Sequence, residues 1–261
     1  MRNEAALPAG FFVVCAVAFG GSAAATVEFC RSMAGRMEMP GGWEISMTWV
    51  RMPGQSWTAS AMMFTLMWLP MMVAMMLPAL IPALRQYRTA FWGNGTTALG
   101  PLTAVVSAGY FSVWTVFGIV VFAAGAALAS IAMRQAAIAR DIPLAGGLVV
   151  LVAGAIQFTR WKARHLAACR APGSHCCVLT PNAGTAWRHG LRLGLECSRC
   201  CLGLMVVLLV IGVMDLRAVT AVTAAISAER LLPNGEQVAR ALGYVVVGGG
   251  LLLIVRAAGL A

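Results

Sequence analysis

The sequence predicts an all-α protein, a polytopic bundle of transmembrane helices with six or seven spans in a single domain, residues 1–261. Composition is the first reason. Sixty per cent of the residues are apolar, only 11% are charged and the mean hydropathy is +0.82, whereas soluble domains carry about 25% charged residues. The second reason is that several uncharged runs approach the roughly 20 residues that a spanning helix needs. Runs of that length indicate helices rather than a barrel.

The positions of these apolar runs predict the order of the spans. We expect spans near residues 7–27, 59–84, 103–130, 142–159, 193–214 and 241–257, and a shorter segment at 218–232 that is either a half-helix or a tilted span. The first run should be a retained anchor, because no small-residue cleavage site with a polar start follows it. Residues 28–58 read as a connecting loop, and 134–141 as a short loop.

The net charge of +10 suggests a membrane topology rather than a nucleic-acid partner. In a chain this apolar, basic residues gather in loops and set orientation, so we expect the lipid bilayer as the partner and no nucleic acid. The most basic segment precedes the fifth span and contains Arg160, Lys162, Arg164, Arg170, Arg188 and Arg192 before any acid. The positive-inside tendency places this segment in the cytoplasm. Counting back through the spans then places the N-terminus there too.

A cysteine motif opens the fifth span and carries the clearest chemical signal. In the stretch GLRLGLECSRCCLGLMVVLLVIGVM, residues 190–214, Cys197, Cys200 and Cys201 are spaced i, i+3 and i+4, with Met205 one turn later. On a helix all four sulfurs share one face. A helix N-terminus and the neighbouring Arg199 favour the thiolate form. Thiolates suit Cu(I), Zn(II) or another soft ion and not Mg or Ca. The alternative is that small buried cysteines only line a helix contact.

A methionine-rich run in the second span offers further soft donors. Met67, Met71 and Met75 continue a repeat that begins at Met63 and recurs every four residues. One interpretation is a thioether ladder for Cu(I). The other is that methionine fills irregular space around a helix kinked by three prolines.

A third group of donors precedes the cysteine motif. His175, Cys176 and Cys177 follow a Pro-Gly pair, and His165 and Cys169 are spaced to share one side of a helix. Either group could share a metal with the main motif or pass one to it by ligand exchange. Both could equally be unrelated surface residues.

Four stretches together resemble a family of predicted metal-binding integral membrane proteins that includes the copper-delivery protein of a bacterial tyrosinase. They are WLPMMVAMMLPALIPAL, GYFSVW, AGAIQFTRWKARHLAACRAP and GLRLGLECSRCCLGLMVVLLVIGVMDL, the last continuing to SAERLLPNGE. The match covers most of residues 59–250 and differs from the usual pattern at Ser198, Arg199 and Asp215. The resemblance implies a bacterial inner-membrane protein that binds copper and loads it into a cuproenzyme or exchanges it with a copper-carrying protein.

Three classes of function are compatible with these residues. The first is metal handling without catalysis, in which Cu(I) is the cofactor or cargo and is delivered to a cuproenzyme; a transporter of copper, mercury or another soft metal would use the same ligands. The second is a membrane thiol oxidoreductase with Cys197 and Cys200 as its redox pair, which would also need a second dithiol and an electron acceptor. The third is a structural subunit in which the sulfurs only pack.

Overall fold

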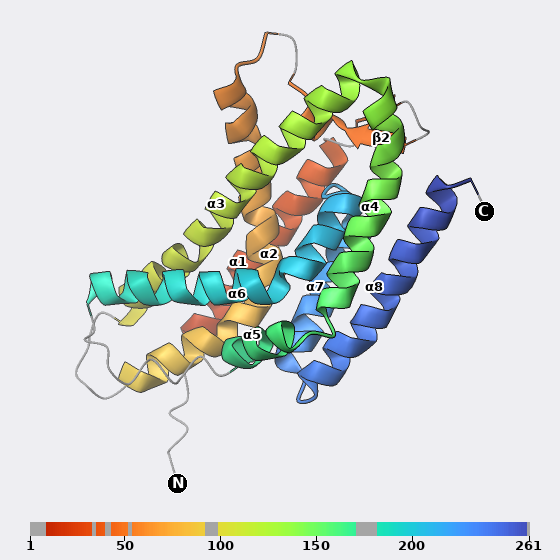
Figure 1. Cartoon of the computed structure of the whole chain (residues 1–261). Coiled ribbons are helices and arrows are strands. Elements are labelled where there is room, and N and C mark those ends of the chain that lie inside the picture. The colour runs from red at the N-terminus through yellow and green to blue at the C-terminus, as the bar shows by residue number, and fades with distance from the viewer. Residues whose placement is uncertain are drawn as a thin grey trace.

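The computed structural model describes residues 9–32, 35–39, 43–51, 54–91, 99–170 and 182–259. Over these residues the predicted all-α bundle is confirmed (Figure 1). Its helices are α1 (Ala9–Ser32), α2 (Trp57–Phe91), α3 (Leu99–Arg134), α4 (Ala136–Ile156), α5 (Arg160–Arg170), α6 (Ala183–Ile211), α7 (Leu216–Leu231) and α8 (Gly235–Ala257).

Six of these helices are long and apolar enough to cross a membrane, which fits a multi-pass membrane protein. They are α1, α2, α3, α4, α6 and α8. The expected partial segment at 218–232 forms α7, which has 16 residues and falls short of a full span. The short helix α5, with Lys162, Leu166 and Cys169 on its buried face, was not predicted as a separate element.

Two connections differ from the expected loops. Residues 28–58 are not all loop: α1 continues to Ser32, strands β1 (Arg36–Met39) and β2 (Trp43–Ser46) pair antiparallel, and the 3-10 turn η1 (Met47–Trp49) follows. The loop predicted at 134–141 is wrong, because α4 already begins at Ala136 and only Gln135 separates it from α3. The hairpin packs onto this junction, where Trp43 Nε1 donates to the carbonyl of Ala139 at 2.7 Å.

Local capping explains where two of the helices begin. Asn182 and Thr185 form a capping box that starts α6, in which the Asn182 side chain accepts from the Thr185 N–H at 2.9 Å. Asp215 caps α7 and accepts from the N–H of Arg217 at 2.8 Å. The connection between α6 and α7 is therefore short and ends in a helix cap.

Glycines bring α3 and α6 into backbone contact. Gly190 and Gly194, one turn apart on α6, face Gly109 and Tyr110 on α3. A Cβ on Gly190 would collide with the carbonyl oxygen of Val106, and one on Gly194 would lie 2.9 Å from the carbonyl oxygen of Tyr110. Small residues at this spacing let membrane helices approach closely. The contact sets Cys197, one turn beyond Gly194, beside Tyr110.

Different secondary-structure elements lie at the two ends of the bundle. Figure 1 shows the β-hairpin and the α3–α4 junction at one end, and α5 at the other end beside the α7–α8 turn. Helix α2 forms much of the core, with Trp68, Met72 and Met76 fully buried. The indole Nε1 of Trp68 donates a hydrogen bond to the carbonyl oxygen of Trp114 on α3 at 2.9 Å.

Candidate metal centre

Five sulfur atoms from three helices meet inside the bundle, and we call this group the sulfur cluster. It consists of Met76 on α2, Cys169 on α5, and Cys197, Cys200 and Cys201 on α6. All five side chains are buried, the most exposed being Cys169 at 7%. The six cysteines that the structure describes are all free thiols.

The cluster is arranged as a row of neighbouring sulfurs. The thiol of Cys169 interacts with that of Cys200, and Cys200 interacts in turn with Cys201. The Sγ atoms of Cys201 and Cys197 are 3.8 Å apart, and Cys197 Sγ lies 4.0 Å from the Sδ atom of Met76. Among the described residues, no three or more His, Cys, Asp or Glu side chains converge in a geometry that would hold a metal ion. The thiols therefore meet pairwise along the row.

The separations within the row fit a soft metal ion. A metal–thiolate bond of about 2.3 Å lets two sulfurs on one ion lie up to about 4.6 Å apart. The distances from Cys197 to Cys201 and to Met76, 3.8 and 4.0 Å, are both within this limit. Two thiolates and a thioether are donors that select Cu(I) and disfavour hard cations.

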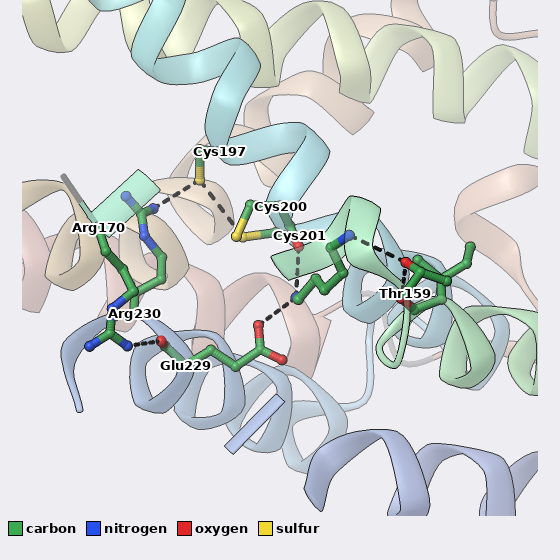
Figure 2. Close-up of polar contacts among 9 residues, drawn as sticks. Thr159, Arg170, Cys197, Cys200, Cys201, Glu229 and Arg230 are labelled. Atoms are coloured by element: carbon green, nitrogen blue, oxygen red, sulfur yellow. Dashed lines mark hydrogen bonds and ion pairs between the residues drawn. The ribbon is translucent and has the colours of Figure 1, made fainter. Parts of the chain in front are cut away.

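Two polar groups converge on the sulfur of Cys197. The hydroxyl of Tyr110 on α3 donates to it at 2.9 Å, and Nη1 of Arg230 on α7 donates at 3.0 Å. Figure 2 shows the Arg230 guanidinium directed at Cys197 next to Cys201. Burial alone would lower the pKa of Arg230, but the facing sulfur of Cys197 outweighs burial and the pKa lies above its ordinary value. A fixed positive charge at this distance favours a thiolate over a thiol.

A buried ion pair joins α5 to α7 below the cluster. Lys162 Nζ lies 2.6 Å from Oε2 of Glu229 and also donates to the carbonyl oxygen of Cys200 at 2.8 Å. The side chains are 3% and 1% exposed. Burial raises the pKa of Glu229, and the Lys162 charge opposes that rise. Arg170 adds a bond from Nη1 to the backbone carbonyl of Glu229 at 2.8 Å (Figure 2). Both ends of α5 are thus tied to Glu229.

Hydrogen bonding has a clear effect on Cys169. The bond it donates to the sulfur of Cys200 holds the Cys169 proton, and burial acts in the same direction. Both effects raise the pKa of Cys169 above its ordinary value.

The structure brings only some of the ligands predicted from sequence to the sulfur cluster. Cys197, Cys200 and Cys201 share one buried face of α6 as the spacing predicts, and Met205 is fully buried one turn further along. Met67, Met71 and Met75 are buried in the core, whereas Met63 is 42% exposed. The predicted ligands His175, Cys176 and Cys177 lie outside the described residues. His165 makes an edge-to-face contact with Trp161 of its own helix.

Sequence reasoning missed four residues of this site. Met76 is the methionine of α2 that reaches Cys197, although the repeat pointed to its neighbour Met75. Tyr110 lies in the GYFSVW stretch, which contributes to the prediction only through the family resemblance. No spacing or motif singles out Arg230 or Glu229. One signal was available for the partner of Glu229: Lys162 is the single lysine of the chain and lies among arginines.

Fold and site together define a multi-pass membrane protein whose helices enclose a row of thiols. Comparison with known proteins adds the family. The sequence model of the PpoB2 family, described as a copper chaperone, matches residues 65–253. That span includes every residue of the sulfur cluster, and the chain belongs to this copper chaperone family. No curated protein and no solved structure matches the chain.

Proposed function

We propose that the protein binds Cu(I) as cargo at Cys197 and Cys201, with Met76 as a third ligand, and delivers it to a cuproenzyme without catalysing a reaction itself. The observation that carries the proposal is the approach of these three sulfurs from α2 and α6 at 3.8 and 4.0 Å. Family membership supplies copper as the metal.

The surroundings of the three sulfurs support Cu(I) in particular. Two thiolates with one monovalent ion carry a net charge of −1, and the Arg230 guanidinium, 3.0 Å from Cys197, balances it. Burying a neutral assembly avoids the large cost of an unpaired charge. The same two thiolates with a divalent ion would leave the Arg230 charge unbalanced.

The proposal includes an orientation in the bacterial inner membrane. The end of the bundle that carries α5 also carries the basic residues of that helix, among them Arg160, Arg164 and Arg170. The positive-inside tendency assigns this end to the cytoplasm, together with the N-terminus. The thiols would then open toward a reducing compartment, where they stay reduced.

Copper analysis of cysteine variants tests the function. We expect the chain purified in detergent under anaerobic reducing conditions to retain Cu(I) against a chromogenic Cu(I) chelator. Cys197→Ser and Cys201→Ser should lose the ion, because each removes one thiolate of the pair. Met76→Leu should retain it with weaker affinity.

The matched control is Cys30→Ser, which alters a buried thiol on α1, outside the sulfur cluster. It should bind copper as the unaltered chain does. Copper retention in both Cys197→Ser and Cys201→Ser would contradict the proposed ligand set. A wild-type chain that binds no Cu(I) would refute the proposal, and a disulfide between Cys197 and Cys200 that cycles in the presence of a quinone would support an oxidoreductase instead.

Replacement of Arg230 tests the role of its charge. Arg230→Gln keeps a hydrogen-bond donor but removes the cation next to Cys197, so Cu(I) affinity should fall by about 10–100-fold, the usual effect of losing a partner of a metal ligand. Arg217→Gln, an exposed position on the same helix, serves as the control. Chelator competition measures both affinities, and equal values would exclude charge balance by Arg230.

A further inference from the structure

The row of sulfurs has two chemically different ends. At one end Cys197 is surrounded by Met76, Tyr110 and Arg230, all from helices of the bundle. At the other end Cys169 belongs to the short helix α5, which is too short to span a membrane. Cys200 lies on α6 one residue before Cys201, and its thiol interacts with those of both Cys169 and Cys201.

The Cys169 end lies next to the surface. A surface cavity of about 330 Å³ is lined by Leu166, Ala167 and Arg170, the neighbours of Cys169 on α5, and by residues 233–237 of the α7–α8 turn. Cys169 itself is 7% exposed, compared with 0% for Cys197 and Cys201. Of the four thiols in the row, Cys169 is the one that shares its helix with residues lining this cavity.

From this arrangement we propose that Cys169 is the outer thiol of a relay, through which Cu(I) moves from the Cys197 and Cys201 pair by way of Cys200 to Cys169 and then to an acceptor at the cavity. The inference rests on the proposed function. Its basis is the unbroken row of four thiols across two helices. A site that only stored copper would not need a thiol on α5.

Each step of the relay is a ligand exchange that conserves charge. In the first exchange the bonds to Cys197 and Met76 break as a bond to Cys200 forms, while Cys201 remains bound. In the second, the bond to Cys201 breaks as a bond to Cys169 forms, while Cys200 remains bound. In each exchange the incoming thiol gives up one proton and the released thiolate takes up one. Copper stays Cu(I) throughout, so no electron donor or acceptor is required.

The kinetics of copper release test this inference. The wild-type chain and Cys169→Ser are loaded with equimolar Cu(I) in detergent and mixed with bathocuproine disulfonate, whose absorbance reports copper transfer. We expect Cys169→Ser to keep its copper with little change in affinity. Its rate of copper release should be lower than the wild-type rate by about tenfold or more, because one exchange step is lost. Cys30→Ser should release copper at the wild-type rate.

Two results would overturn the relay. One is release from Cys169→Ser at the wild-type rate. The other is loss of copper binding in Cys169→Ser, which would make Cys169 a resident ligand. Cys169→Ala repeats the test if the serine variant fails to fold, as judged by gel filtration. A wild-type chain without bound copper would instead refute the proposed function, so the two failures are distinguishable.

Discussion

Lys162→Met is expected to destabilise the protein by about 3–5 kcal/mol, because it leaves the Glu229 carboxylate buried without its cation. The pair is closed at 2.6 Å, and both side chains are almost fully inaccessible. The variant also removes the donor to the carbonyl of Cys200. Thermal unfolding in detergent, monitored by circular dichroism, measures the loss.

The double variant Lys162→Met with Glu229→Leu separates charge burial from packing. Replacing both ions by apolar residues of similar size should recover most of the stability, leaving a deficit of about 1 kcal/mol for the lost bond to Cys200. Arg164→Met, at an exposed position of α5, controls for the substitution itself. If the double variant is no more stable than Lys162→Met, the ion pair is not the cause.

Gly190→Ala should have the second largest effect, a destabilisation of about 1–3 kcal/mol from overpacking. Its Cβ would collide with the carbonyl oxygen of Val106 and lie 3.1 Å from the Cα atom of Gly109. Backbone atoms cannot rotate away as a side chain can, so α3 and α6 must separate. Tyr110 would then move away from Cys197, and Cu(I) affinity should fall along with the melting temperature.

Gly248→Ala provides a matched comparison in α8. That glycine is exposed, and an added Cβ there has nothing within 4 Å. Since alanine is favoured over glycine in a helix by up to about 1 kcal/mol, this variant should melt at the same temperature or higher. Equal melting temperatures for Gly190→Ala and the wild-type chain would show that the α3–α6 contact tolerates a methyl group.

The cysteine motif shows how far the sequence leads toward the site. The spacing of Cys197, Cys200 and Cys201 predicts a common helix face, and the structure has them together on the buried face of α6. Their softness as ligands follows from residue type alone. The spacing does not reveal that Cys197 pairs with Cys201 while Cys200 contacts Cys169, because Cys169 arrives from α5.

The methionine run shows where periodicity is insufficient. Met75 and Met76 are adjacent, and neighbouring residues on a helix point about 100° apart. Every position from Met75 to Leu77 is buried, so burial does not choose between them. Met76 is in contact with Cys197 because of the way α2 and α6 are packed.

The sequence by itself determined the class of the protein: apolar runs long enough to span a membrane, and soft donors gathered before and within the fifth span. Hydropathy and ligand softness are properties of single residues and of their spacing along one helix. Only the tertiary structure decided which donors meet. Contacts such as Tyr110 with Cys197, or Lys162 with Glu229, join residues 87 and 67 positions apart. They depend on how closely the helices approach, which glycines such as Gly109 and Gly190 permit.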